Sequence, residues 1–359
     1  MSRVFKEKMM ADNLVRVGIA GLGRSGWGIH ARILRTVTDL FKVAAVFDAD
    51  PKRLEEANKD FGCKTYTDFK SLIADKDVEL VVVAMPSHLH APCTIEALGA
   101  GKAVVCEKPM ATNTADADKM IAAAHKAGKF FTIFQNYRYN AHYQKLKEVI
   151  ESGKLGRIVE IKITVHGFGR RWDWQTLQEF GGGSLNNTGP HFMDMALQLM
   201  GDKDPKVFCH LERTQTLGDA DDHVKVILQA KGSPMVDLEI TSTCAYGQEM
   251  WLVMGTCGGL AGTPSALRWK YFDPKALPPR TVDTKPTPDR SYNSEPIPWQ
   301  PEETWDKTKW AGPDQNQFYK EVYASLRQGA PVPIKPESVR RQIAVLEECH
   351  RQAPLPRRK

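Results

Sequence analysis

Short apolar segments and segments with a helical pattern alternate through the first 135 residues of the chain. Strands are predicted at 15–20, 42–47, 64–67, 79–85, 103–106 and 130–134, with helices between them, among them Pro51–Phe61, Phe69–Ala74 and Thr114–Ala127. The run 79–85 is continuously apolar, so we expect both of its faces to be covered, as in the middle of a parallel sheet. The alternation predicts an α/β fold with a doubly wound parallel sheet.

The pattern changes after residue 135. A helix is predicted at about 141–152, and strands then follow one another at 157–167, 206–215, 223–230, 234–243 and 250–255, interrupted by one helix at about 189–200. Such a run predicts a second α/β domain with a large, mostly antiparallel open sheet that has one face available as an interface. Two amphipathic helices near 314–328 and 336–351 close the chain, and we expect them to return to the first domain.

A segment rich in proline and tryptophan lies at 273–310. It holds eight prolines, at 274, 278, 279, 286, 288, 296, 298 and 301, together with Trp299, Trp305 and Trp310. A loop of this length is usually a lid, an arm or a linker. The tryptophans favour an ordered arm that packs on another surface, such as a neighbouring subunit. With the open sheet face, the arm predicts a homo-oligomer, a dimer or a tetramer.

Composition and charge argue against several classes of protein. The 49 basic and 43 acidic residues give a net charge of +6 that is spread along the chain, apart from the basic tail 357–359, so no nucleic-acid partner is expected. The seven cysteines form no C-x-x-C pair, which fits a reducing cytoplasmic setting. No segment has the apolar length of a signal peptide or a membrane span, so no membrane partner is expected.

The first predicted strand is followed by three glycines, Gly21, Gly23 and Gly26, at G-x-G-x-x-G spacing. Gly21 allows a sharp turn, and Gly23 allows a pyrophosphate to approach the N-terminus of a helix that opens near Ser25. Asp48 ends the second strand, 22 residues after Gly26, where a βαβ unit places the carboxylate that holds a ribose diol. The alternative is a glycine-rich turn with Asp48 capping the next helix.

This pattern predicts a dinucleotide cofactor and divides the chain. Asp48 favours NAD over NADP because a carboxylate repels a 2′-phosphate, whereas Arg24 could reach either the pyrophosphate or that phosphate. Pro86, His88 and His90 follow the strand at the carboxyl edge of the sheet, and the histidines either line the cofactor cleft or are only N-terminal helix residues. We assign 1–13 to a polar extension, 14–135 to a Rossmann domain and 136–359 to a substrate-binding and oligomerisation domain.

Two groups of residues carry candidate catalytic chemistry. Glu107 and Lys108 follow the strand 103–106, so we expect both at the cofactor and Lys108 to project toward the nicotinamide. The glycine-rich segment 180–190 leads to His191 and Asp194, which share a helix face. Such a histidine can exchange a proton near neutral pH, or the His-Asp pair can tie the helix to the sheet. No third ligand stands at a recognisable spacing, so no metal is expected.

The segment 166–174 leaves the first strand of the second domain and should overhang the cleft. Arg170, Arg171 and Asp173 offer hydrogen bonds to hydroxyl groups, and Trp172 or Trp174 could stack on the apolar face of a pyranose. The alternative is a set of surface charges around a buried tryptophan.

Several motifs together resemble the Gfo/Idh/MocA oxidoreductase family over nearly all of the chain after Asn13. They are the glycine turn 21–26, Glu-Lys-Pro at 107–109, Asn-Tyr-Arg-Tyr at 136–139, Gly-Lys-Leu-Gly-Arg at 153–157 and the glycine-rich loop that ends in Gly-Pro-His at 189–191. The resemblance implies an N-terminal Rossmann domain, a C-terminal domain with an open, mostly antiparallel sheet, and NAD(P)-dependent oxidation or reduction of sugars and cyclitols.

The resemblance also suggests roles for individual residues. Lys108 corresponds to the catalytic lysine of the family, His191 to the histidine of its Asp-x-x-x-His pair, and Arg138 to a substrate contact. Asn187 stands where the family usually carries the aspartate. An amide cannot take up a proton, although it can bind a substrate hydroxyl or orient His191. Acid–base work would therefore fall to His191 and Lys108.

These features predict an NAD-dependent dehydrogenase that oxidises a secondary hydroxyl of a sugar or glycoside to a ketone. His191 and Lys108 would handle the proton while hydride moves to the nicotinamide. One alternative is a redox-neutral, NAD-containing glycoside lyase or glycosidase that works through a transient 3-keto sugar. Another is a non-catalytic protein that senses a dinucleotide or a sugar. Retention of Lys108 and His191 counts against the sensing protein, and Asn187 counts for it.

Overall fold

The computed structural model describes residues 13–287 and 290–358. The polar extension predicted at 1–13 therefore lies outside the described residues except for Asn13, as do Pro288 of the predicted arm and Lys359 of the basic tail. In the described part of the chain, no helix is both long and apolar enough to cross a membrane.

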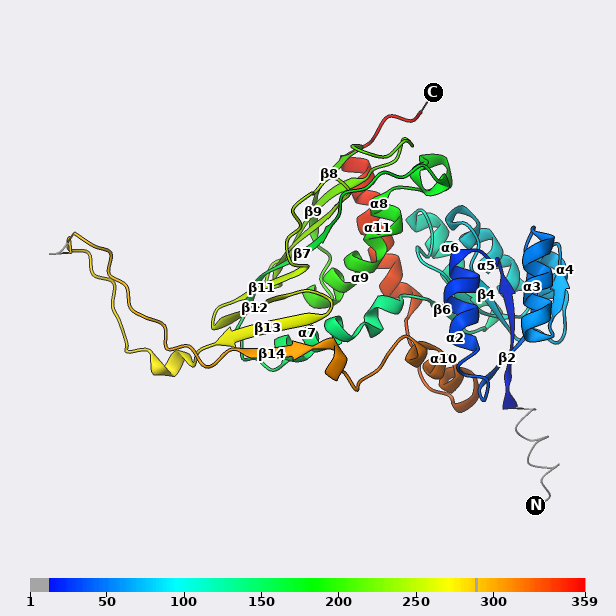
Figure 1. Cartoon of the computed structure of the whole chain (residues 1–359), viewed down its shortest axis with the longest axis horizontal. Helices are drawn as coiled ribbons and strands as arrows, with labels where there is room; N and C mark the ends of the chain where they lie inside the picture. Colours follow the sequence, from blue (N-terminus) through cyan, green and yellow to red (C-terminus); the bar gives the residue numbers. More distant parts are fainter. Residues whose placement is uncertain (1–12, 288–289, 359) are drawn as a thin grey trace, which may run out of the picture.

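A six-stranded parallel sheet forms the N-terminal part of the chain (Figure 1). Its order is β3-β2-β1-β4-β5-β6, with β1 at Val15–Ala20, β2 at Phe41–Phe47, β3 at Lys64–Tyr66, β4 at Leu80–Val83, β5 at Ala103–Cys106 and β6 at Phe131–Ile133. Every residue of β4 and β5 is buried, as their continuously apolar sequences predict. The strand order reverses between β1 and β4, and ligands of such sheets bind at this reversal.

The helices of this part are the π-helical turn η1 (Gly26–Ala31), α2 (Arg32–Leu34), α3 (Pro51–Phe61), α4 (Phe69–Ala74), the turn η2 (Ser87–Leu89), α5 (His90–Gly99) and α6 (Thr114–Ala127). Three of them, α3, α4 and α6, begin directly after a side-chain cap. Asp50, Asp68 and Asn113 each accept a hydrogen bond from a backbone N–H in the first turn of the helix that they precede. Gly62 ends α3 with φ 61°, a conformation that glycine adopts without strain.

The second sheet has eight strands in the order β14-β13-β12-β11-β7-β10-β9-β8. The strands are β7 (Ile158–His166), β8 (Lys206–Glu212), β9 (His223–Gln229), β10 (Met235–Thr241), β11 (Trp251–Gly255), β12 (Gly258–Gly262), β13 (Ala266–Tyr271) and β14 (Glu303–Asp306). Neighbouring strands are antiparallel except for the parallel pair β7 and β10. The predicted fold class, a Rossmann sheet with a mostly antiparallel second sheet, is confirmed.

Three strands of this sheet, β12, β13 and β14, escaped the sequence prediction. β12 reads Gly-Gly-Leu-Ala-Gly, a composition that is poor in strand-forming residues. Gly258 and Gly262 are required by close approach to β13, because a Cβ on them would lie 2.3 Å from the carbonyl oxygen of Lys270 and 2.2 Å from that of Ala266. β14 has only four residues and is placed by its pairing with β13.

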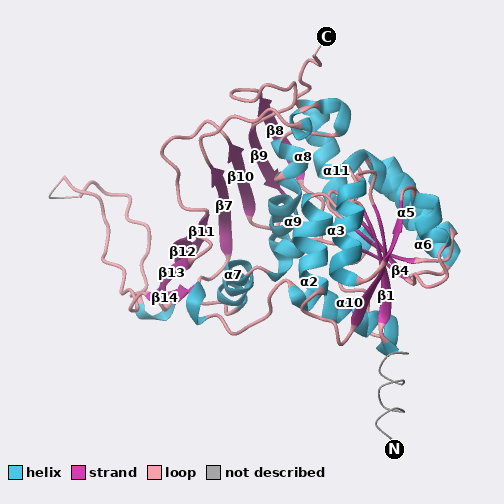
Figure 2. Cartoon of the chain, turned by 45° about the vertical axis from the view of Figure 1, so that its right-hand side comes forward, coloured by secondary structure: helices cyan, strands magenta, loops and turns pink. Residues whose placement is uncertain are grey.

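Helices cover one face of the eight-stranded sheet, whereas no described helix lies on the opposite face (Figures 1 and 2). These helices include α7 (Ala141–Glu151), α8 (Ser184–Asn187), α9 (Gly189–Met200) and α11 (Pro336–Gln352), and α10 (Asn316–Gln328) lies beside the Rossmann sheet. Charged side chains lie on the uncovered face. There the ammonium group of Lys225 lies 2.6 Å from Asp237 and 3.1 Å from Glu239.

The last helix connects the two sheets. Near the start of α11, Arg340 makes two hydrogen bonds to Asp118 of α6, at 2.9 and 3.0 Å. At its end, the amide of Gln352 donates to the carbonyl of Val207 in β8 at 2.7 Å. The residues just before α11 also reach the Rossmann sheet, where Thr132 donates to the carbonyl of Ile334 at 2.8 Å.

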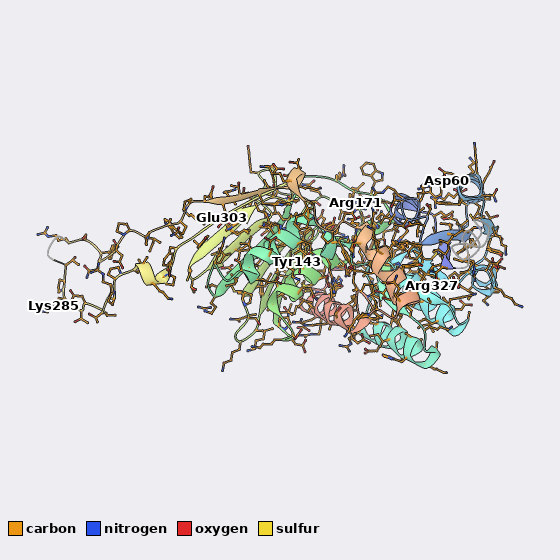
Figure 3. All side chains as sticks on the ribbon, turned by 90° about the horizontal axis from the view of Figure 1, so that it is seen from below. Asp60, Tyr143, Arg171, Lys285, Glu303 and Arg327 are labelled. Carbon is orange, nitrogen blue, oxygen red and sulfur yellow. The ribbon has the colours of Figure 1, made fainter. Side chains whose placement is uncertain are left out.

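The segment between β13 and β14 extends far from both sheets (Figure 1). In Figure 3, Glu303 marks the root of this arm and Lys285 lies toward its far end. The two legs are joined by an ion pair of 2.9 Å between Arg280 and Glu295. Val282 and Tyr292 are 92% and 95% exposed.

The tryptophans of the arm lie at its root. Trp299 packs edge-on against Phe272 with ring centroids 5.7 Å apart, and Trp305 packs in the same way against Trp310 at 6.2 Å. Trp305 is buried on β14. These contacts order the root of the arm within one chain, and packing of its outer part on another subunit stays a prediction.

Candidate active site

A cleft of about 830 Å³ opens at the carboxyl ends of β1, β2, β4 and β5. Fourteen of the residues singled out in the sequence line it: Gly21, Gly23, Arg24, Ser25, Asp48, Pro86, His90, Glu107, Lys108, Arg171, Asp173, Trp174, Asn187 and His191. Six described residues that were also singled out do not line it: Gly26, His88, Arg138, Arg170, Trp172 and Asp194. The cleft is therefore shared by the glycine turn, the Glu-Lys segment and the glycine-rich loop, and it lies at the reversal of strand order.

The glycine turn leaves an open space where a phosphate group fits. A Cβ on Gly21 would lie 2.7 Å from the carbonyl oxygen of Ala84, and one on Gly26 only 1.8 Å from the carbonyl oxygen of Gly21. These two glycines let the helix pack on the strand, so Gly26 has a packing role. Gly23 has no atom within 4 Å of its Cβ position and lines the cleft. Its bare backbone at a helix start suits the pyrophosphate of a dinucleotide.

Asp48 follows β2 and lines the cleft. Its Oδ2 accepts a hydrogen bond from the N–H of Leu22 at 2.7 Å, and its Oδ1 accepts one from the N–H of Asp50 at 2.9 Å. The cap of α3 is Asp50, whose side chain accepts from the N–H of Lys52, so the alternative in which Asp48 caps that helix is wrong. Arg53, which the sequence reasoning missed, lines the cleft beside Asp48 at 3.4 Å.

The two histidines after β4 occupy different places. His90 is buried, and its ring nitrogens lie 2.6 Å from the carbonyl oxygen of Pro109 and 2.8 Å from that of Met85. Burial lowers the pKa of His90, although both carbonyl contacts raise it. His90 thus ties the loop after β4 to the backbone that follows Lys108. His88 is an exposed residue whose ring centroid lies 5.8 Å from that of Phe180.

Glu107 is held as a buried carboxylate. Its Oε1 lies 3.1 Å from the Nε2 of His30, and its Oε2 accepts from the N–H of Lys108 at 2.9 Å. Burial raises the pKa of Glu107, but the hydrogen bond and charge of His30, with help from Lys108, bring the pKa down to about 2. The other ring nitrogen of His30 lies 2.7 Å from the hydroxyl of Tyr319 in α10. Sequence reasoning missed His30 and Tyr319.

Lys108 is directed toward the glycine-rich loop. Its Nζ donates a hydrogen bond to the carbonyl oxygen of Asn187 at 3.0 Å. Burial lowers the pKa of Lys108, opposed by Glu107 and reinforced by Arg24, so the neutral amine is more accessible than in an exposed lysine. The Nδ2 of Asn187 donates to the carbonyl of Gln175 at 3.1 Å, which leaves its Oδ1 as the acceptor end of the amide.

His191 is a neutral imidazole at the inner end of the cleft. Tyr137 stacks on it, with ring centroids 3.8 Å apart and planes 16° apart. Its Nδ1 is buried and has no hydrogen-bond partner among the described residues. Burial and, to a smaller extent, the charge of Lys108 lower the pKa of His191 to about 3. Tyr137 lines the cleft. It was not singled out in the sequence, although it belongs to the motif at 136–139 that carries the family resemblance.

Arg138 and Asp194 pair with each other, in contrast to both expectations. The guanidinium of Arg138 makes two hydrogen bonds to the carboxylate of Asp194, at 2.7 and 2.6 Å, and a third to Ser338 at 3.1 Å. Asp194 is 2% exposed, so a charged partner is required there. Arg138 therefore faces α9 and α11 rather than the cleft, and Asp194 is not the partner of His191.

The segment after β7 brings three of the five residues named in the sequence analysis to the cleft. Arg171, Asp173 and Trp174 line it, whereas Arg170 and Trp172 do not. The guanidinium of Arg171 makes hydrogen bonds of 3.0 and 2.8 Å to Asp173. Trp174 is 43% exposed and Trp172 is 75% exposed, so neither is the buried tryptophan of the alternative interpretation. No group of three or more His, Cys, Asp or Glu side chains in the described chain could hold a metal ion.

Comparison with known proteins adds independent evidence. Residues 15–135 match the family model "Oxidoreductase family, NAD-binding Rossmann fold", and residues 143–261 match the "GFO/IDH/MocA C-terminal domain". The myo-inositol 2-dehydrogenase of Thermotoga maritima is 32% identical over 251 residues, which cover 68% of this chain and 74% of that protein. An uncharacterized oxidoreductase of Schizosaccharomyces pombe is 28% identical over 255 residues, 68% of this chain and 69% of that protein.

Solved structures share the fold over almost the whole chain. The WlbA dehydrogenase from Bordetella pertussis, in complex with NADH and UDP-GlcNAcA, has a TM-score of 0.75 and 23% sequence identity. The similarity covers 95% of this chain and 96% of that one.

Proposed function

Because the chain belongs to the GFO/IDH/MocA family of NAD-binding oxidoreductases, we propose that it is a dehydrogenase that oxidises a secondary hydroxyl group of a sugar or glycoside to a ketone. The observation that carries the proposal is the meeting of Lys108, Asn187 and His191 in one cleft with the glycine turn. The relative from Thermotoga maritima is named for the oxidation of a cyclitol, which is chemically close to a sugar ring.

The residues at one end of the cleft suit NAD. The open backbone at Gly23 and the side chain of Arg24 would hold the pyrophosphate, and Asp48 would hold the ribose hydroxyl groups. When NAD is bound, its nicotinamide ring supplies a hydride acceptor. Asp48 favours NAD over NADP, since its carboxylate would repel a 2′-phosphate.

Lys108 is the group best suited to take the proton of the substrate hydroxyl. Its lowered pKa makes the neutral amine available, and the carbonyl of Asn187 fixes the position of Nζ. The ionised carboxylate of Glu107 stabilises the ammonium group that results. His191, with a pKa of about 3, is a weaker base, and we assign to it a hydrogen bond that orients the substrate hydroxyl.

The other end of the cleft offers contacts to a ring with several hydroxyl groups. Trp174 presents an aromatic surface, and the paired side chains of Arg171 and Asp173 present donors and acceptors at the mouth. An apolar ring face and converging polar groups are the combination that a pyranose or cyclitol requires.

The proposal is tested by absorbance at 340 nm with purified protein, added NAD and a panel of free sugars, inositols and glycosides. We expect NADH to form with at least one of them. Consumption of a glycoside without net NADH, by protein that retains NAD, would show the redox-neutral lyase or glycosidase instead. If no panel compound is consumed although NADH binds, the chain is better described as a sensing protein.

A further inference from the structure

A small chamber lies directly behind one wall of the cleft. Arg171, Gln175 and Asn187 line both the cleft and the chamber, while Asp221 and Ser242 line the chamber alone. Its volume is about 20 Å³. A polar space of that size is large enough to hold a water molecule.

Asp221 accepts hydrogen bonds from the backbone of the loop that carries Asn187. The carboxyl group is 4% exposed, and its Oδ2 accepts a hydrogen bond from the N–H of Leu185 at 2.7 Å. Its backbone carbonyl accepts from the N–H of Ser184 at 2.8 Å. Gly183 has φ +104°, and a Cβ there would lie 2.3 Å from the Oδ1 of Asp221. The loop therefore lies against the carboxyl group two residues before Asn187.

Asn187 is the link between the chamber and the reacting groups. The Nδ2 group of Asn187 has two N–H bonds. One of them donates to the carbonyl of Gln175, and the second remains as a donor. A water in the chamber can accept that second N–H and donate one of its own hydrogens to Asp221. The Oδ1 of Asn187 is then free to accept a hydrogen bond from a substrate in the cleft. The backbone carbonyl of the same residue already accepts a hydrogen bond from Lys108.

We propose that Asp221 acts through one water in this chamber as a positioning residue, which polarises the Asn187 amide and supplies from behind the carboxylate charge that position 187 lacks. The proposal rests on the proposed dehydrogenase function, because it concerns the hydroxyl that Asn187 and Lys108 would hold. The proposal also gives a role to the buried carboxyl group of Asp221, which takes no part in the proposed proton transfer to Lys108.

The charged and titratable groups around Asp221 come from three elements. Asp222 is the next residue in the chain, and Arg171 lines the chamber together with Asp221. The charge of Asp221 also raises the pKa of the Cys349 thiol in α11. Burial raises the pKa of Asp221 to about 7, with the N–H of Leu185 opposing and Asp222 adding to the rise. Above this pH the carboxylate accepts a hydrogen from the water, whereas below it the acid can donate, which removes the polarisation of Asn187.

The test is the pH dependence of kcat/KM with NAD and the best substrate of the panel. We expect an acid limb with an inflection near pH 7 in the unmodified protein. In Asp221→Asn the carboxamide still accepts from Leu185, but it cannot ionise. We expect the inflection near pH 7 to vanish and kcat to fall by about tenfold, with KM little changed. In the double variant Asp221→Asn with Asn187→Asp, a carboxylate returns to the site and we expect most of the rate to return.

Asp219→Asn is the matched control. Asp219 lies two residues from Asp221 and accepts hydrogen bonds from the N–H groups of Gln178 and Arg358, but it does not line the chamber. Its variant should keep the inflection. An inflection near pH 7 that survives in a folded Asp221→Asn protein, as judged by its melting temperature, would overturn the proposal.

A crystal structure that resolves ordered waters gives a readout independent of turnover. We expect one water within hydrogen-bond distance of both Asp221 and the Nδ2 of Asn187. If no sugar is oxidised, the proposed function fails, but a water at this place still supports the link between the two residues. A dry chamber overturns the link even if a sugar is oxidised.

Discussion

The ring of Tyr137 lies flat against the imidazole of His191, with 3.8 Å between ring centroids. The stack covers one face of an imidazole whose buried Nδ1 has no partner in the described part of the chain, and this environment keeps the ring neutral. Tyr137 therefore fixes the orientation of His191 rather than its charge. We expect Tyr137→Phe, which keeps the stack, to retain most activity, and Tyr137→Leu to lower kcat by about tenfold. Equal loss in both variants would show that the hydroxyl of Tyr137 acts instead.

Removal of the Lys108 amine should abolish most turnover. We expect Lys108→Met to lower kcat by about 10²- to 10⁴-fold, the usual contribution of a positioned base, because Met fills the space without accepting a proton. NADH binding, measured by fluorescence, should change much less. Lys52→Met, on the exposed surface of α3, is the control and should keep full activity. Normal turnover by Lys108→Met would refute the assigned role.

Substitutions at three glycines near the start of the chain test the proposed cofactor site separately from packing. We expect Gly23→Ala to fold normally but to bind NADH roughly tenfold more weakly, a loss of about 1.4 kcal/mol, because the methyl group enters the open cradle. Gly26→Ala should lower the free energy of unfolding by about 1–3 kcal/mol, since its methyl group meets the carbonyl of Gly21. Gly28→Ala, which faces open space outside the cleft, should do neither. Unchanged NADH affinity in Gly23→Ala would contradict the cofactor site.

The buried His142 should make the protein sensitive to acid. Burial and the charge of Lys307 lower its pKa to about 4, and its Nδ1 accepts a hydrogen bond from the indole N–H of Trp251 at 3.1 Å, which only the neutral ring can do. In the unfolded chain a histidine titrates near its ordinary value of about 6.5. Between these values the unfolded state binds the extra proton, so stability falls as pH falls through this range.

The expected loss from His142 between pH 7 and pH 5 is about 2 kcal/mol of unfolding free energy, measured by urea titration. His142→Gln can still accept from Trp251 and cannot be charged, so its stability should fall less over the same range. His125→Gln is the control, because the side chain of His125 is 75% exposed. A wild-type acid response in His142→Gln would contradict the argument.

The arm between β13 and β14 should control assembly. We propose that its exposed outer part, which includes Val282 and Tyr292, packs on a second copy of the chain. Light scattering should give a dimer or a tetramer for the full chain and a smaller species when residues 277–298 are replaced by a short glycine-serine link. NADH should still bind, since the arm does not line the cleft. An unchanged assembly after this replacement would contradict the role of the arm.

The elements of the fold that could be predicted were those whose hydrophobic pattern or capping residue lies within a short stretch of sequence. The apolar runs of β4 and β5 indicated buried strands, and Asp68 was identified as the cap of α4 before the helix was seen. β13 carries a readable alternation, in which Leu267 and Trp269 are buried between exposed residues, and the prediction overlooked it. β14 could not be recognised, because four residues beyond a long arm carry no periodic signal.

The site was predictable where a motif marks it and unpredictable where distant residues meet. Lys108 and His191 were identified from the Glu-Lys-Pro segment and the glycine-rich loop, and Asn187 from the resemblance of that loop to the family's Asp-x-x-x-His pair. The contact of His30 with Tyr319 joins residues 289 positions apart, and no local pattern encodes such a distance. The Arg138–Asp194 pair spans 56 positions and replaced two roles that had been inferred from neighbours in sequence.

The path of α11 restricts how the cleft can open. A single rigid helix is anchored to α6 by Arg340 and to β8 by Gln352, so a hinge rotation of one sheet relative to the other would have to break these anchors (Figure 2). The segment 167–174 carries no such restraint from α11, and all of its residues are exposed. The helix α11 therefore restrains the spacing of the two sheets, and the exposed segment that brings Arg171 and Trp174 to the cleft lies outside this restraint.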